Sequence, residues 1–148
     1  MDSPDARNLS PSPTRSEIEE DHRHLGALLD RLETTTVPWR LTPLLRDLDG
    51  MLTRHFRLEE ARGGLLEAIT DTAPRNAGRV EDLLLEHRRI LDALAALIHE
   101  TQDRPNGPPE DMLREAKRLV ERLRRHEEEE NLVLGDGYYT DLGSPGSA

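Results

Sequence analysis

The sequence predicts an all-α protein, an antiparallel up-down-up-down four-helix bundle. In four long stretches, apolar residues recur three and four positions apart, which is the spacing that puts them on one face of a helix. Segments rich in proline, glycine or aspartate separate these stretches. No segment of useful length alternates apolar and polar residues as a half-buried strand does. Four amphipathic helices with short connections favour the antiparallel bundle.

The bundle is expected to occupy residues 16–134 of the 148-residue chain, which is long enough for one domain. Residues 1–15 and 135–148 are rich in small, polar and proline residues, so they cannot bury enough apolar surface to offset their ordering entropy. Both are therefore predicted to be flexible tails. The mean hydropathy of −0.73 is low, but the helical periodicity argues against disorder of the whole chain.

The first helix is predicted over residues 16–34. Ser16 and Glu19 have the spacing of a capping box, and the segment 37–39 (VPW) ends the helix. Its inward stripe is Ile18, His22, Leu25, Leu29 and Leu32.

The second helix is predicted to begin with Thr42 as N-cap and Pro43 at the first helical position. Gly63 and Gly64 weaken it, residues 65–69 are expected to add a turn or two, and residues 71–78 are expected to form a turn. The inward stripe is Leu41 or Leu44, then Leu48, Leu52, His55 and Glu59.

The third and fourth helices are predicted over residues 79–100 and 110–134, on either side of the loop DRPNGPP at 103–109. The third stripe is Val80, Leu84, His87, Leu91, Leu94 and Ile98. The fourth is Met112, Ala116, Leu119, Leu123, His126, Glu130 and Val133.

Each of the four stripes contains one histidine, and on two of them a glutamate follows four residues later. Residues four apart lie one above the other on a helix, so the imidazole and the carboxylate can reach the same point. Counting residues from the connecting loops puts all these groups in one layer, to within about one helical turn. The six candidate metal ligands are His22, His55, Glu59, His87, His126 and Glu130.

Two carboxylates buried in one layer would repel each other and would be poorly solvated without a cation. Imidazole nitrogen and carboxylate oxygen suit iron, manganese or zinc. Six protein ligands suit two metal ions better than one crowded ion. The alternative is a bundle held by hydrophobic packing without metal, in which each histidine is a core residue with a satisfied hydrogen bond.

Other polar residues are expected to have ordinary roles. His24 lies on a polar face and would enter the site only as a replacement for His22. His99, near the end of the third helix, is expected to interact with the helix dipole. The glutamates expected to be solvated are Glu60, Glu86, Glu127, Glu128 and Glu129, with two alternatives: Glu86 as a partner of His87, and Glu127–Glu129 as counter-charges of Arg122, Arg124 and Arg125.

Composition excludes several other classes of protein. The absence of cysteine excludes disulfides, thiolate zinc sites, iron–sulfur clusters and a cysteine nucleophile, and it fits a cytoplasmic location. A net charge of −10 argues against binding to nucleic acid or to an anionic membrane surface. No apolar run approaches the ~20 residues of a membrane span, and the N-terminal segment lacks the apolar core of a signal peptide.

Four fragments together resemble the hemerythrin or HHE cation-binding domain, over about residues 16–134. They are DHRHL (21–25), HFRLE (55–59), EHRRI (86–90) and HEEEE (126–130). The resemblance implies a hemerythrin-like bundle with a non-haem di-iron centre. By position, His22 and His55 would bind one iron ion, and His87 and His126 the other. Glu59 and Glu130 would bridge the two ions.

Two departures from the oxygen-carrying members point to the divergent HHE branch of the family. Leu83 and Leu91 occupy the positions four residues from His87 where those members have a second histidine. Five residues after His126, where they tend to have aspartate, this chain has Asn131, and Glu130 takes that role.

The resemblance implies a protein that binds or senses dioxygen or a related small ligand, such as peroxide or nitric oxide. It would contain two iron ions per chain, with zinc or manganese as possible substitutes. One alternative is a di-iron enzyme with catalase-like or nitric-oxide-reducing activity. A further alternative is an iron-responsive interaction module, in which metal loss loosens the bundle and a protein partner reads the change.

Overall fold

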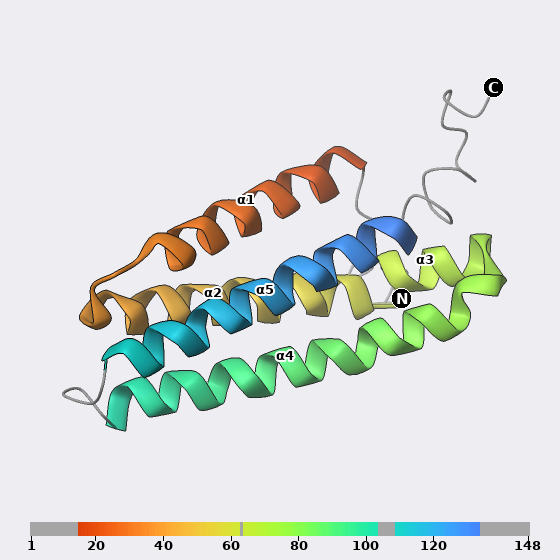
Figure 1. The fold of residues 1–148 in the computed structure, drawn as a ribbon. Helices are drawn as coiled ribbons and strands as arrows, with labels where there is room; N and C mark the ends of the chain where they lie inside the picture. Colours follow the sequence, from red (N-terminus) through yellow and green to blue (C-terminus); the bar gives the residue numbers. More distant parts are fainter. Residues whose placement is uncertain (1–14, 63, 104–108, 134–148) are drawn as a thin grey trace, which may run out of the picture.

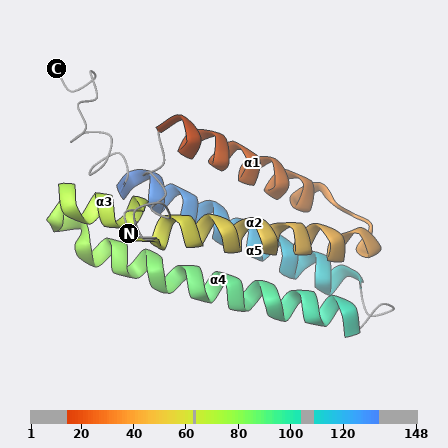
Figure 2. The same ribbon diagram turned by 180° about the vertical axis from the view of Figure 1, so that it is seen from behind.

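Four long helices form an antiparallel bundle in the computed structural model, which describes residues 15–62, 64–103 and 109–133. They are α1 (Arg15–Thr34), α2 (Leu41–Glu60), α4 (Ala77–Asp103) and α5 (Pro109–Val133). Helices α1 and α4 each pack against both α2 and α5, and successive long helices run in opposite directions (Figures 1 and 2). The described residues contain no strand, so the all-α up-down-up-down prediction is confirmed.

A short fifth helix, α3 (Leu65–Thr72), covers one end of the bundle beside α2 and α4 (Figure 1). The prediction that residues 65–69 continue the second helix is wrong, because Ala61 is extended (φ −62°, ψ 152°) and ends α2. The predicted turn at 71–78 is also mostly helical: it contains the end of α3, a 3-10 turn (Pro74–Asn76) and the start of α4.

The predicted caps of the first two helices are not used as caps. Helix α1 begins at Arg15, so Ser16 lies inside it. A 3-10 turn (Pro38–Arg40) leads directly into α2, where the Leu41 N–H donates to the Pro38 carbonyl and Thr42 falls in the first turn. The predicted tails, apart from Arg15, and residues 104–108 of the predicted loop lie outside the described residues. None of the described helices is long and apolar enough to cross a membrane.

The inward stripe is confirmed on α5, where all seven predicted residues are buried, and it is rotated on α4. Val80, His87 and Leu94 are buried as expected. On their flank the structure buries Leu83, Ile90 and Leu97, and leaves the predicted Leu84, Leu91 and Ile98 half-buried. Both flanks carry leucine or isoleucine at the same spacing of seven, so the pattern alone does not distinguish them.

The buried apolar residues form two separate clusters. The larger cluster fills the part of the bundle toward the 34–41 connection and includes Leu25, Leu52, Phe56, Ile90 and Leu123. The smaller cluster lies at the α3 end and contains Leu66, Ile69, Val80, Leu83 and Val133. Along α4 and α5, the polar residues of the predicted stripes fall between these two clusters.

Gly64 joins α2 to α3 where the backbone passes very close to the end of α2. A Cβ atom at this position would lie 2.5 Å from the Leu58 carbonyl oxygen and 2.7 Å from that of Ala61. The Gly64 N–H also donates to the Ala61 carbonyl. The absence of a side chain at Gly64 therefore allows α2 to end directly after Glu59 and Glu60.

We expect Gly64→Ala to destabilise the fold by about 1–3 kcal/mol, because backbone atoms would have to move to admit the methyl group. Gly50→Ala is the matched control: Gly50 lies in α2 with open space around its Cα, so alanine should stabilise the helix by about 0.5–1 kcal/mol. Denaturant unfolding measures both changes. Equal changes in the free energy of unfolding for the two substitutions would contradict the close approach of Gly64 to the end of α2.

A second pair of substitutions tests the orientation of α2. Leu52 is fully buried, and Leu58 on the same helix is 56% exposed. Leu52→Ala should cost about 2–5 kcal/mol because it leaves a cavity, whereas Leu58→Ala should change the free energy of unfolding by less than ~0.5 kcal/mol. Thermal and denaturant unfolding give both values, and a larger loss for Leu58→Ala would mean that α2 is rotated.

Candidate metal centre

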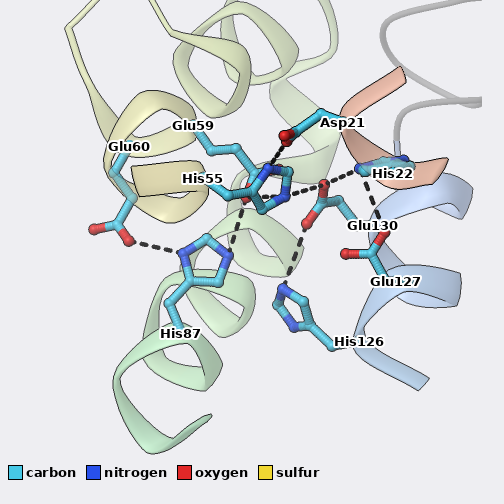
Figure 3. Close-up of polar contacts among 9 residues, drawn as sticks. All are labelled: Asp21, His22, His55, Glu59, Glu60, His87, His126, Glu127 and Glu130. Carbon is cyan, nitrogen blue, oxygen red and sulfur yellow. Dashed lines mark hydrogen bonds and ion pairs between the residues drawn. The ribbon is translucent and has the colours of Figure 1, made fainter. Parts of the chain in front are cut away.

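All six predicted ligands converge in one layer of the bundle, between the two apolar clusters (Figure 3). They come from the N-terminal halves of α1 and α4 and the C-terminal parts of α2 and α5, which the antiparallel topology brings to the same level. His22 is half-buried, and the other five are buried, with Glu130 completely inaccessible to solvent.

The Glu59 carboxylate lies between histidines of two helices. Its Oε1 atom is 3.4 Å from Nε2 of His55, one turn earlier on α2. The same oxygen is 3.5 Å from Nε2 of His87 on α4. Glu59 therefore faces one histidine from each of the two predicted pairs.

The Glu130 carboxylate also reaches both pairs. Its Oε1 atom is 3.0 Å from Nε2 of His22 and 3.9 Å from Nε2 of His55. Its Oε2 atom is 3.4 Å from Nε2 of His126 on its own helix. Two groups of potential metal-binding atoms result, both of which include Glu130: His22, His55, Glu59 and Glu130 in one, and His87, His126 and Glu130 in the other.

Several of these atoms are buried without any hydrogen-bond partner in the described part of the chain. They are Nε2 of His55, His87 and His126, both carboxylate oxygens of Glu59, and Oε2 of Glu130. A buried polar atom without a partner costs about 1–3 kcal/mol, and more when it is charged. So many unpaired atoms in one layer are difficult to reconcile with a core held only by packing.

A cation would satisfy these atoms, and the set of donors fits one. Imidazole nitrogen and carboxylate oxygen are ligands of iron, manganese and zinc. Donor atoms about 2.1 Å from a shared ion lie roughly 3–3.5 Å apart, which is close to the separations between these histidine and glutamate atoms. The layer therefore has the composition and spacing of a metal centre.

Two further carboxylates hold histidines from outside the centre. The His55 Nδ1–H donates to Asp21 Oδ2 on α1, and the His87 Nδ1–H donates to Glu60 Oε2 at 2.7 Å (Figure 3). Such a bond fixes the ring orientation and leaves Nε2 free to bind a metal. Glu60 is exposed, as expected, but its bond to His87 was not predicted. One sequence signal could have indicated these two carboxylates, because each adjoins a predicted ligand: Asp21 precedes His22, and Glu60 follows Glu59.

Glu127 was also expected to be solvated, and for this residue the expectation is wrong. Its side chain is only 15% exposed, and its Oε2 atom lies 3.4 Å from Nε2 of His22. Its Oε1 atom is buried without a hydrogen-bond partner in the described residues. Glu128 and Glu129 are exposed, as predicted.

Arg122 and Arg124 of α5 are paired with carboxylates other than Glu127–Glu129. Arg122 donates to both oxygens of the half-buried Glu86, at 2.7 and 3.3 Å, so Glu86 pairs with Arg122 rather than with His87. Arg124 pairs with Asp30 and Glu33 of α1. His24 is exposed and outside the site, and the exposed His99 pairs with Asp103 at 2.9 Å.

Burial and the charges of neighbouring side chains shift the pKa values of the buried carboxylates. Burial, together with the charge of Glu130, raises the pKa of Glu59 well above its usual range. Burial alone would raise the pKa of Glu130 too, but the hydrogen bond from His22 and the close side chains of Glu59 and His126 hold it well below its usual range. For Glu127, burial and the charge of Glu130 raise the pKa to about 7.

The pKa values of His22 and His55 shift in the opposite direction from the pKa of His87. Burial lowers the pKa of His22 and of His55, but the surrounding carboxylates, led by Glu130 and Asp21 respectively, outweigh burial and raise both values. Burial dominates at His87 and lowers its pKa despite the bond to Glu60. The His22–His55 side therefore lies in the more negative environment.

Phe56 closes the layer toward the larger apolar cluster. Its ring stacks on His87 with centroids 3.7 Å apart and an interplanar angle of 7°. Its centroid also lies 5.7 Å from that of His55 and 5.6 Å from that of His126. Phe56, itself 1% exposed, thus separates three imidazoles from the leucines behind it.

Comparison with known proteins agrees with this geometry. A family model described as the hemerythrin HHE cation binding domain matches residues 14–136, which include the whole described bundle. Searches of curated proteins and of solved structures found no significant match. Because the family model covers most of the chain, the protein belongs to the hemerythrin HHE cation-binding domain family, whose members bind metal cations.

Proposed function

We propose that this protein holds a non-haem di-iron centre that binds or senses dioxygen or a related small ligand, such as peroxide or nitric oxide. The main support for the proposal is the position of the two buried carboxylates, Glu59 and Glu130. Each lies close to a histidine of the first pair, His22 and His55, and to a histidine of the second pair, His87 and His126. His22 and His55 would hold one ion, and His87 and His126 the other. Glu59 and Glu130 would be shared between the two ions.

The charges of the described residues favour two ions over one. Four neutral imidazoles and two carboxylates carry a charge of −2, and three further carboxylates lie next to them: Asp21, Glu60 and Glu127. One divalent cation would leave these side chains with a net negative charge, whereas two would bring them close to neutrality. Uncompensated charge is costly in a site of low polarity.

The surroundings of the centre favour a small ligand. Iron ions, when bound, supply redox chemistry and coordination positions for such a ligand. The chain excludes bulk water through Phe56 and the two apolar clusters, and five of the six candidate ligands are buried. Six side chains do not fill the positions of two six-coordinate ions, so an external ligand has room to bind.

Iron loading tests the proposal. Protein reconstituted with ferrous iron without oxygen should contain two ions per chain, and its absorption spectrum should change when oxygen or nitric oxide is added. Binding of a single ion, or a spectrum indifferent to these gases, would contradict the proposal. Rapid, catalytic release of oxygen from peroxide would instead favour the enzymatic alternative.

Asp21 and Glu60 provide a more specific prediction. Asp21→Asn and Glu60→Gln remove the charged acceptors of the His55 and His87 Nδ1–H groups, so each should weaken iron binding about 10–100-fold. The matched controls are Asp92→Asn and Glu128→Gln, at exposed positions of α4 and α5. Competitive titration with a chelator measures the affinities. Equal affinities in all four variants would mean that the outer carboxylates do not orient the ligands.

Metal removal should loosen α1 more than the other long helices. The contacts of Asp21 and His22 tie the N-terminal half of α1 to this layer. A cation at 100 times its dissociation constant adds about 2.7 kcal/mol to the free energy of unfolding. Chelation should therefore lower the melting temperature and speed amide exchange in residues 15–25 of α1. Equal rates of amide exchange in residues 15–25 of the loaded and the metal-free protein would contradict the role of the metal in holding α1.

A further inference from the structure

Glu127 has the position of a ligand to the metal centre rather than that of a surface residue. We propose that Glu127 is a seventh protein ligand and that it serves the ion held by His22 and His55. This inference rests on the proposed di-iron function. It adds Glu127 to the six ligands that the helical spacing predicts.

The contacts of the Glu127 side chain point into the centre (Figure 3). Oε2 lies 3.4 Å from Nε2 of His22, within the range of separations found among the other candidate ligands. Oε1 is inaccessible to solvent and has no hydrogen-bond partner among the described residues. A carboxylate that contacts a candidate ligand with one oxygen and buries the other unpaired has the arrangement expected of a metal donor.

Helix geometry explains how α5 can supply three donors. His126 and Glu130 are four residues apart, and Glu127 and Glu130 are three apart, so both pairs are neighbours on the helix surface. Glu130 therefore lies at the middle of the inward face, with His126 and Glu127 on its two flanks. Helix α5 packs between α4 and α1. His126 faces the side of His87 on α4, and Glu127 faces His22 on α1.

An ordinary structural role explains Glu127 less well. Two arginines of α5 already have other partners, since Arg122 bonds to Glu86 and Arg124 to Asp30 and Glu33. The contact with His22 leaves Oε1 unpaired, and Glu130 already accepts a closer bond from the same nitrogen at 3.0 Å. A cation next to His22 would pair with both Glu127 and Glu130.

The seventh ligand would make the two halves of the centre unequal. The His22–His55 ion would have three ligands of its own, including one anion, and the His87–His126 ion would have two. Leu83 and Leu91, one turn either side of His87, offer no donor atom. The ion held by His87 and His126 would therefore keep more open coordination positions for a small ligand than the ion held by His22 and His55.

Glu127→Gln tests this assignment, because it keeps the size of the side chain and removes its charge. The matched control is Glu128→Gln, at the next and exposed position of α5. For wild type and both variants, the number of bound ions and their affinities are measured with ferrous iron and with cobalt(II), whose visible absorption reports coordination number. Melting temperatures of the metal-free proteins are measured in parallel.

In Glu127→Gln we expect one of the two ions to bind more weakly, by more than the ~10–100-fold loss expected for an outer carboxylate. The cobalt spectrum should change, and the melting temperature of the metal-free protein should not fall. Glu128→Gln should match wild type throughout. Wild-type affinities and spectrum in Glu127→Gln, or a lower melting temperature without metal, would overturn the assignment while leaving the di-iron proposal intact. Failure of wild type itself to bind two ions would overturn both.

Discussion

The burial of Glu59 and Glu130 at the centre of the bundle is the constraint on which the rest of the structure depends. Both carboxylates are buried, and among the described residues their ion-pair partners are imidazole nitrogens rather than arginines or lysines. Neutral imidazoles compensate the charge of two buried carboxylates only in part. The layer is therefore consistent with a fold completed by a cation, and the family to which the chain belongs binds cations.

The bundle is arranged so that this layer can be assembled from four helices. Antiparallel packing brings His22, His55, His87 and His126 to one level, although more than a hundred residues separate the first from the last. Apolar clusters on both sides keep water away from the layer. Asp21 and Glu60 then hold two of the imidazoles from outside, so the helix surface contributes to the geometry of the interior.

The fold and the six central residues could be predicted because helical periodicity indicates which residues face inward, although on α4 it could not distinguish two flanks with the same spacing. Glu59 and Glu130 were identifiable because carboxylates on an apolar stripe contradict the pattern around them. Glu60 and Glu127 could not be found in this way, since each adjoins a stripe residue, where periodicity predicts a solvated flank. The break between α2 and α3 occurs next to Gly64, which the sequence indicates as a weak point of the helix, but residue type alone did not predict the close approach of Gly64 to the Leu58 and Ala61 carbonyl oxygens.

The central claim is that two metal ions share Glu59 and Glu130. Anomalous diffraction at the iron edge, from crystals of iron-loaded protein, tests it most directly. We expect two peaks in the polar layer, one beside His22 and His55 and the other beside His87 and His126, with both carboxylates between them. A single peak, or peaks only at surface carboxylates, would contradict the account.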